Sequence, residues 1–169
     1  MVIDLCHRPG ARRQLKNLED KAKQYALRLL SYRGRSVKEL EERLRRKKFP
    51  ADVVSSIISK FRRAGFLDDV ALAEALKREA TKTKFLSHYG ARRFMLSRGI
   101  AREIVDSAFS PDEAEDIDNA RSLIEKKLKI IDYLPAEKKK RRLYQLLLRK
   151  GYSFEIIESA LKGINSKEV

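Results

Sequence analysis

Side chains that could do covalent or metal chemistry are scarce in this chain. Cys6 and His7 are adjacent near the start, and His88 lies far from both. Zinc sites need several Cys or His ligands at short, characteristic spacings, and the sequence has no Cys-x-x-Cys pair. Neither histidine has a serine or cysteine partner with a third group to orient it, and neither common glycine-rich phosphate loop occurs. We therefore expect no enzymatic activity, no metal and no cofactor.

The adjacent carboxylates Asp68 and Asp69 are a second candidate, for metal binding or acid–base chemistry. Successive residues of a helix point about 100° apart, which is poor geometry for a shared ligand. An aspartate just before a helix instead accepts hydrogen bonds from its first amides, and a second aspartate complements the positive end of the helix dipole. We interpret Asp68 as the cap of a helix that begins near Val70.

Lysine and arginine runs are the third candidate, because their side chains form ion pairs with carboxylates and phosphates. A single basic run is more often a solvated helix face. Here such runs recur at three comparable places along the chain, which favours a repeated basic ridge that meets an extended anionic partner. The candidate binding residues are Arg45, Arg46, Lys47, Arg92, Arg93, Arg98, Lys139, Arg141, Arg142, Arg149 and Lys150.

The overall charge also favours an anionic partner. The 169 residues include 39 Lys and Arg against 24 Asp and Glu, a formal net charge of +15, which indicates nucleic acid, a nucleoprotein or an anionic membrane surface. Basic residues outnumber acidic ones by 18 to 7 in residues 1–64 and by 13 to 9 in residues 114–169, whereas residues 65–113 hold 8 of each. A single cysteine, no secretory signal and no long apolar run predict a cytoplasmic protein without a membrane span.

The elements that position these cations follow from an apolar pattern that occurs three times, anchored at Phe49, Ile100 and Tyr152. In each copy, apolar residues stand five positions before the anchor and four, five, eight and nine positions after it. That spacing predicts the inner edge of one helix, a turn, and a second helix whose apolar stripe has a period near 3.6. The candidate cations fall on or directly after the first helix of each pair.

A further helix is predicted ahead of each pair, at Tyr25–Leu30, Val70–Ala80 and Ile117–Leu128. The chain should therefore be all-α, with three tandem three-helix units, about nine helices and no strand. We place a basic N-terminal arm at residues 1–17, the three units at 18–66, 67–110 and 111–163, and a C-terminal tail at 164–169. The junction between the first two units comprises Gly65, Phe66, Leu67, Asp68 and Asp69.

Capping signals agree with these elements. Ser36-Val-Lys-Glu39 and Ser110-Pro-Asp-Glu113 both have the pattern of a capping box, the second with proline at the first helical position. Left-handed helix ends are predicted at Gly34, Gly65, Gly99, Gly151 and Gly163. Base-stacking platforms are not indicated, because the following aromatic residues match or adjoin predicted core positions: Phe49, Phe61, Phe66, Phe109 and Tyr152.

Three segments are similar to those of a known family. They are Arg63-Ala-Gly65-Phe66-Leu67-Asp68-Asp69-x-x-Leu72-Ala73, Ser36-x-x-Glu39-Leu40-x-x-x-Leu44 and Arg142-Leu-Tyr-x-x-Leu-x-Arg149-Lys-Gly151-Tyr-Ser. Over about residues 21–162 the chain resembles the RecX family, bacterial regulators of the RecA recombinase. It departs from the family at Leu72, where Phe is usual. It departs again at Ser87, where a glycine commonly opens a helix of the second unit and Gly90 here stands one turn in.

The resemblance implies an elongated, curved protein that binds in the helical groove of the filament of RecA on single-stranded DNA. It implies contacts with neighbouring recombinase subunits and with the DNA, and inhibition of ATP hydrolysis and strand exchange. The protein would then regulate recombination and DNA repair as a monomer without catalytic activity. The candidate cations would form ion pairs with acidic filament surface or with phosphates, gaining affinity from several sites at once.

Two other interpretations stay open at this point. The first is a direct DNA-binding module of tandem helix-turn-helix-like units that needs no recombinase partner. Its affinity should fall steeply with salt, because each neutralised phosphate releases counterions. The second is a helical scaffold protein, which binds neither DNA nor a recombinase.

Overall fold

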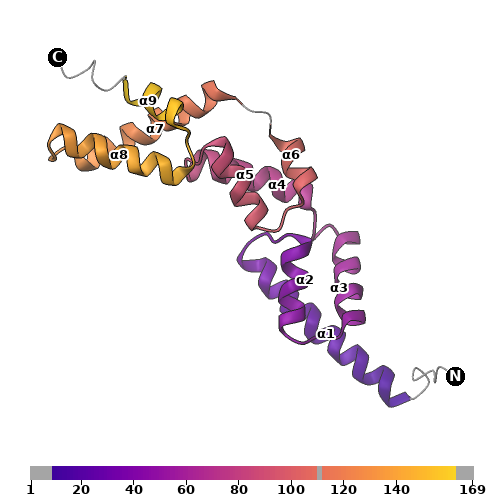
Figure 1. Cartoon of the computed structure of the whole chain (residues 1–169). Helices are drawn as coiled ribbons and strands as arrows, with labels where there is room; N and C mark the ends of the chain where they lie inside the picture. Colours follow the sequence, from indigo (N-terminus) through magenta and orange to yellow (C-terminus); the bar gives the residue numbers. More distant parts are fainter. Residues whose placement is uncertain (1–8, 110–111, 163–169) are drawn as a thin grey trace. The chain divides into compact units, whose positions relative to one another are not determined.

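The computed structural model describes residues 9–109 and 112–162, with side chains from residue 14 onward. All regular structure in this part of the chain is helical (Figure 1), which confirms the predicted all-α class. The helices are α1 (Pro9–Tyr32), α2 (Val37–Arg46), α3 (Ala51–Arg63), α4 (Asp69–Arg78), α5 (His88–Ser97), α6 (Arg102–Ala108), α7 (Glu113–Ile131), α8 (Ala136–Lys150) and α9 (Phe154–Lys162), and a short π-helical segment, η2 (Glu79–Thr83), continues α4. The single helix predicted ahead of each of the three pairs corresponds in turn to α1, to α4 with η2, and to α7.

The described residues form two compact units, each with its own core. The first unit comprises the residues up to Leu72 together with Arg98–Ile100, and the second comprises Ala73–Ser97 and the residues from Ala101 onward. Helices α1, α2 and α3 therefore belong to the first unit, and α5 to α9 belong to the second. Helix α4 begins in the first unit and ends in the second.

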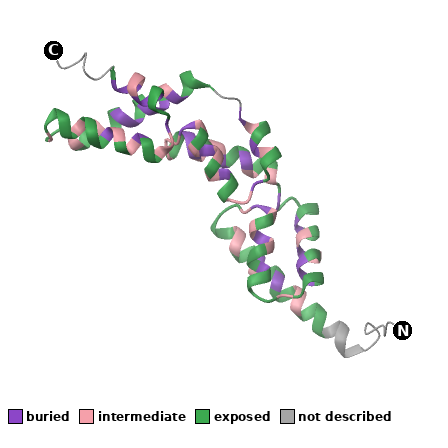
Figure 2. Cartoon of the chain, in the orientation of Figure 1, coloured by how far each residue is buried: buried purple, intermediate pink, exposed green. Residues whose placement is uncertain are grey.

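The core of the first unit lies between α1, α2 and α3. Leu40 and Leu44 stand one turn apart on α2 and are fully buried, as expected for the apolar stripe of an amphipathic helix. Figure 2 shows buried residues along the inner edges of these helices and exposed residues on their outer faces. The residues that pack together are Ala22, Ala26, Leu40, Leu44, Val53, Val54, Ile57, Phe61 and Leu67.

The N-terminus of α2 is held by two side chains. Ser36 Oγ accepts a hydrogen bond from the Glu39 amide at 3.1 Å, which confirms the predicted cap, and its hydroxyl donates to the Arg98 carbonyl at 2.8 Å. The amide of Val37 donates to Asp69 Oδ1 at 3.0 Å. The carboxylate of Glu39, which a complete capping box would direct back to the helix start, instead pairs with arginines. Helix α2 is thus tied to two segments that lie far along the chain.

Asp68 caps α4, as predicted. Its Oδ1 accepts hydrogen bonds from the amides of Val70 and Ala71, at 2.9 Å each. Because Asp69 is bonded to the start of α2, the two adjacent carboxylates serve two different helices. Their arrangement is that of two caps, not that of a shared ligand.

Glycines in the left-handed region end three of the helices, as predicted. Gly65 follows α3 with φ 73°, Gly99 follows α5 with φ 79°, and Gly151 follows α8 with φ 90°. The prediction for Gly34 is wrong: its φ is not positive, and it lies instead where a Cβ would come within 2.8 Å of Leu72 Cδ1. The fifth predicted stop, at residue 163, lies outside the described residues.

The second unit has its main core between α7, α8 and α9. The apolar stripes of the three helices meet there, and the residues at all six predicted offsets of the third repeat are buried. The residues that pack together are Ala120, Leu123, Ile124, Leu143, Leu147, Tyr152, Ile156, Ile157, Ala160 and Leu161. The buried apolar residues of α4, η2, α5 and α6 in the same unit are Ala73, Leu76, Ala80, Ala91, Met95 and Val105.

Several groups hold the start of α5 in the second unit. Asp116 of α7 accepts hydrogen bonds from the His88 amide with both carboxylate oxygens, at 2.8 and 3.1 Å, and Ser87 Oγ accepts one from the Gly90 amide at 3.0 Å. The Ser87 amide donates to the carbonyl of Lys150, at the end of α8, at 3.1 Å. A Cβ on Gly90 would come within 2.3 Å of that carbonyl oxygen. The glycine one turn into α5 is therefore required by the close approach of α8.

The starts of α1 and α7 differ from the sequence-based expectation. Helix α1 begins at Pro9, so residues 9–17 of the predicted arm are helical; proline suits a first helical turn, and the residues after Gly10 are mostly good helix formers. The N-cap of α7 is Asp112, whose side chain accepts a hydrogen bond from the Glu115 amide at 3.1 Å. The cap predicted at Ser110 is therefore wrong, and residues 110–111 themselves lie outside the described part of the chain.

Phe66 was predicted at or beside a core position, but its side chain is mostly outside the core. The residue is 57% exposed, and its ring contacts that of buried Phe61 with a centroid separation of 5.5 Å. Leu67, the next residue, is the one that enters the core of the first unit. The left-handed turn at Gly65 sets this alternation, because it redirects the chain between α3 and α4.

Candidate functional site: paired and exposed cations

The structure separates the eleven candidate cations by burial. Four of them have partly buried side chains with partners within their own unit, and these are Arg92, Arg98, Lys139 and Lys150. The other seven are exposed, namely Arg45, Arg46, Lys47, Arg93, Arg141, Arg142 and Arg149. An exposed cation is accessible to a partner's anion, whereas a partly buried one has already exchanged water for contacts within the protein.

Arg98 belongs to a cluster of three arginines around one carboxylate, which we call the Glu39 cluster (Arg33, Arg35, Arg98 and Glu39). Arg33 Nη2 lies 2.6 Å from Glu39 Oε1, Arg35 pairs with the same oxygen, and Arg98 Nε lies 3.9 Å from Oε2. Arg98 Nη2 also donates to the Gly34 carbonyl at 3.0 Å. The side chains of Arg35, Glu39 and Arg98 are 9%, 15% and 17% exposed. Arg98 thus joins residues 98–100 to the start of α2 within the first unit. The sequence did not predict this role, because the carboxylate partner of Arg98 is distant in the chain.

The candidates at the end of α2 are more accessible. Arg45 pairs with Glu41 one turn earlier at 2.6 Å, and its side chain is 65% exposed. Lys47 Nζ lies 5.6 Å from the centroid of the Tyr25 ring, and Arg46 is exposed. Ion pairs between exposed side chains contribute little free energy, so these cations can be redirected to another partner.

The candidates on α5 are divided between the two kinds. Arg92 pairs with Asp106 of α6, and its side chain is 30% exposed. Arg93 is exposed, with its guanidinium carbon 5.8 Å from the centroid of the Tyr89 ring, itself on the surface. Arg92 thus joins α5 to α6, whereas Arg93 and Tyr89 form a small cation–aromatic pair at the surface.

Helix α8 carries five exposed cations along its 15 residues. Leu143 and Leu147 bury one face of the helix in the core, and most of its charged residues are exposed. We call the exposed set the α8 cations: Lys138, Lys140, Arg141, Arg142 and Arg149. Lys139, between them, is 15% exposed and donates to Asp132 Oδ1 at 2.8 Å. That hydrogen bond lowers the pKa of the Asp132 carboxyl group.

The end of α8 is a region of positive potential. Lys150 Nζ donates to the Lys84 carbonyl at 2.5 Å. Burial lowers the pKa of its ammonium group, and the charges of Lys84, Lys127 and Arg149 lower it further. Cations from α7 (Lys127), from α8 (Arg149) and from the residue after η2 (Lys84) thus lie near the C-terminal end of α8.

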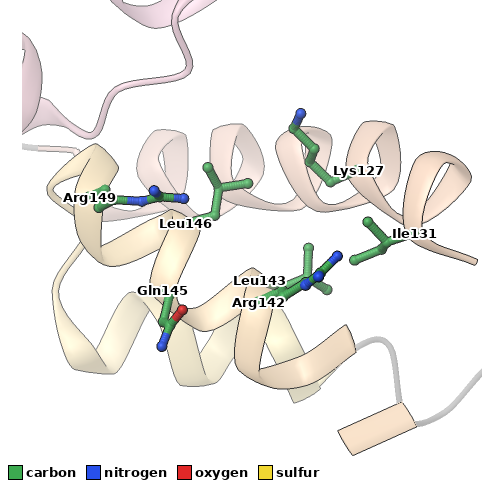
Figure 3. A pocket seen from close by; sticks show the side chains of 7 residues that line it. All are labelled: Lys127, Ile131, Arg142, Leu143, Gln145, Leu146 and Arg149. Carbon is green, nitrogen blue, oxygen red and sulfur yellow. The ribbon is translucent and has the colours of Figure 1, made fainter. Parts of the chain in front are cut away.

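A groove lies between α7 and α8, with a volume of about 340 Å³ (Figure 3). Lys127 and Ile131 line it from α7, one turn apart. The residues that line it from α8 are Arg142, Leu143, Gln145, Leu146 and Arg149. Two of the predicted binding residues, Arg142 and Arg149, are thus brought together with Lys127, which the sequence did not single out. Lys127 lines the groove only because α7 and α8 pack together, which the sequence does not predict.

Two further features of the described residues bear on function. Within residues 9–109 and 112–162, no three His, Cys, Asp or Glu side chains gather in a way that could hold a metal ion. No helix in the same ranges is both long enough and apolar enough to cross a bilayer.

Comparison with known proteins places this arrangement in a family. Residues 22–61 match the first three-helix domain of RecX, and residues 113–161 match its third three-helix domain. The chain is similar to the regulatory protein RecX of Streptomyces coelicolor, with 30% identity over 135 residues that cover 79% of this chain and 72% of the relative. It is also 30% identical to the regulatory protein RecX of Thermobifida fusca over 148 residues, which cover 86% of this chain and 79% of that one.

A solved structure agrees with the sequence matches. The crystal structure of RecX from Lactobacillus salivarius superimposes with a TM-score of 0.68 at 25% identity, covering 89% of this chain and 99% of that one. The matched segments correspond to the helix sets α1–α3 and α7–α9, which confirms the prediction of tandem three-helix units. Two of the three segments that first indicated the resemblance, residues 36–44 and 142–153, fall within the matched domains, and the third, residues 63–73, lies between them. The chain therefore belongs to the RecX family of regulatory proteins.

Proposed function

We propose that this protein binds the filament that the RecA recombinase forms on single-stranded DNA and lowers its ATP hydrolysis and strand exchange. It would act by binding alone, as a non-enzymatic modulator of recombination and DNA repair. Membership of a family of regulatory proteins supports a regulatory role. The first experiment below tests whether this regulation is inhibition.

The exposure of the α8 cations is the observation that most strongly supports a filament partner. Five positive side chains extend from a helix of 15 residues, which is about 22 Å long at 1.5 Å per residue. A filament of protein on single-stranded DNA presents closely spaced phosphates and acidic side chains over comparable distances. A row of solvated cations suits such a partner, because it gains Coulomb energy without the cost of breaking internal ion pairs.

Exposed cations in both units support binding at more than one point. The first unit presents Arg46 and Lys47 at the end of α2, and the second unit presents the α8 cations. When two weak sites are linked in one chain, the second binds as an intramolecular event at high effective concentration. A repeating filament offers equivalent anionic sites on successive subunits, so modest contacts from each unit add up to useful affinity.

The direct test is the ATPase rate of a RecA recombinase on single-stranded DNA as this protein is added at near-physiological salt. We expect the rate to fall at well below one molecule of this protein per recombinase subunit, because each bound molecule affects the filament. If the rate falls only when the protein is abundant enough to coat the DNA, competition for phosphates explains the effect and the filament is not its target.

A direct DNA-binding module is the second candidate function, and the same exposed α8 cations favour it. They could neutralise phosphates without any recombinase. In that case the logarithm of affinity for a single-stranded oligonucleotide falls with the logarithm of salt concentration with a slope near −0.7 per neutralised phosphate. A filament-binding protein instead requires the recombinase and depends less steeply on salt, because part of its interface is protein.

A further inference from the structure

The groove between α7 and α8 combines an apolar floor with a positively charged rim. Leu143 is buried, and Ile131 and Leu146 are half-buried and pack against the core of the second unit. Figure 3 shows the side chains of Leu146 and Arg149 toward one end and those of Ile131 and Arg142 toward the other. The floor is thus accessible between two helices that hold it in a fixed shape.

The rim carries three cations and no opposing charge. Lys127, Arg142 and Arg149 line the groove, Gln145 is the remaining polar residue, and none of the described residues that line it has a carboxylate. Burial lowers the pKa of Lys150 close by, and the positive charges of Lys84, Lys127 and Arg149 lower it further. This repulsion between like charges marks a place where a negative partner is favoured.

The apolar floor distinguishes between two anionic partners. A nucleic-acid backbone offers phosphates to the three cations, but it leaves Ile131 and Leu146 facing polar groups or water. A peptide segment with an apolar side chain between acidic residues satisfies both parts, because burial of apolar surface contributes roughly 25 cal/mol per Å² in addition to the ion pairs. At about 340 Å³, the groove is at the small end of ligand pockets, a size suited to one large side chain.

We infer that the groove between α7 and α8 is a peptide-docking site, and that its occupant is a segment of the recombinase in which an apolar side chain is flanked by acidic residues. The inference rests on the proposed function for the identity of the partner, and on the charge and apolar lining of the groove for the chemistry. Phosphate contacts are then left to the α8 cations outside the groove, such as Arg141.

The test uses the full-length protein, two charge-reversal variants and three fluorescent probes. Lys127→Glu places a carboxylate in the groove, whereas Lys129→Glu makes the same change on an exposed position of α7 that does not line it. The first probe is a peptide of four glutamates, one phenylalanine and four glutamates. The second replaces the phenylalanine by serine, and the third is a single-stranded oligothymidylate. Fluorescence anisotropy gives the Kd of each probe for each protein.

We expect Lys127→Glu to weaken binding of the phenylalanine peptide by about tenfold, and Lys129→Glu by less than about twofold. The serine peptide should bind the unmodified protein about fivefold or more weakly than the phenylalanine peptide, and the two variants should bind the oligothymidylate equally. The inference is wrong if the two peptides bind equally or not at all. It is also wrong if Lys127→Glu weakens binding of the oligothymidylate more than binding of the peptide, since the groove is then a phosphate site.

Failure of this inference is distinguishable from failure of the proposed function. If the unmodified protein inhibits the recombinase ATPase but the peptides do not discriminate, the filament is the target and the groove is not the docking site. If the unmodified protein leaves the ATPase unchanged, the proposed function is wrong, whatever the peptides show.

Discussion

In the first unit, Arg33, Arg35 and Arg98 gather around the carboxylate of Glu39, and the side chains of two of them are largely buried. In the second unit, the α8 cations extend into solvent from a helix whose only acidic residue is at its first turn. The sequence alone assigns Arg98 of the first set to the same basic ridge as the arginines of the second. Their surroundings assign the first set to the fold and leave the second available for a partner.

The two sets differ in how far contacts within the protein have replaced the water around their cations. Arg35 and Arg98 have lost much of their hydration, which ion pairs with Glu39 and a hydrogen bond from Arg98 to the Gly34 carbonyl replace. A charged group in that position stabilises the fold only while its partner is present. The α8 cations keep their hydration, so their removal should hardly affect folding. The predictions below separate the two sets, from the largest expected change in free energy to the smallest.

The strongest test of the Glu39 cluster is Glu39→Ala, which removes the shared carboxylate and leaves three arginines close together. We expect the free energy of unfolding of the first unit to fall by about 3 kcal/mol, because partly buried charges lose their compensation. Denaturant unfolding monitored by circular dichroism measures this. Glu41→Ala, which removes the partner of exposed Arg45, is the matched control and should cost less than about 0.5 kcal/mol. Equal losses in the two variants would remove the distinction between paired and exposed cations.

A paired comparison of arginines sharpens the same distinction. Arg98→Ala should lower the free energy of unfolding by about 2 kcal/mol, because a charge-assisted hydrogen bond and a share in the Glu39 cluster are lost. Arg149→Ala, on the exposed side of α8, should change it by less than about 0.5 kcal/mol. The same denaturation measurement applies. An Arg149→Ala loss as large as that of Arg98→Ala would show that the α8 cations are part of the fold.

The smallest expected effect is a dependence on pH that is confined to the second unit. Burial lowers the pKa of His88, and the charges of Arg92 and Lys77 act in the same direction, whereas those of Asp116 and Glu115 oppose it. The folded state therefore holds fewer protons than the unfolded state as the pH falls below the usual histidine pKa of about 6.5. We expect the second unit to lose stability between about pH 7 and pH 5.5.

Hydrogen exchange of the amides of α5 and α2, measured across this pH range and corrected for intrinsic rates, follows the two units separately. Protection in α5 should decrease on acidification, and His88→Gln should remove most of that decrease. Burial also raises the pKa of Asp116 above its ordinary value of 3.8, so its protonation opposes the histidine effect at lower pH. A decrease of equal size in α2 would contradict the assignment of the effect to His88.

The repeated apolar spacing made the helix sets predictable, because burial of one stripe per helix is a local property of the sequence. Leu44, Met95 and Leu147, five residues before their anchors, are all fully buried. The caps at Ser36 and Asp68 were predictable for the same reason, since each bonds to amides a few residues away. The start of α7 was not, because two capping patterns overlap there and the later one, at Asp112, is used.

The candidate site was predictable only in part. Exposed runs such as Arg141 and Arg142 can be recognised from the sequence, but pairing across the chain cannot. Arg98 meets Glu39 through a long-range contact within the first unit, and Lys127 lines a groove only because α7 and α8 pack together. Neither contact follows from helical periodicity, which reports burial along one helix and not which helices meet.

The most direct test of the central claim compares two double charge reversals in the recombinase ATPase assay on single-stranded DNA. Arg141→Glu with Arg142→Glu alters the α8 cations, and Lys16→Glu with Lys21→Glu makes the same change in net charge at exposed positions of α1. We predict that the α8 variant needs about tenfold more protein for half-inhibition, that the α1 variant stays within about twofold of the unmodified protein, and that both keep its helicity and melting temperature. An α8 variant that inhibits as well as the unmodified protein would contradict the claim that these cations bind the filament.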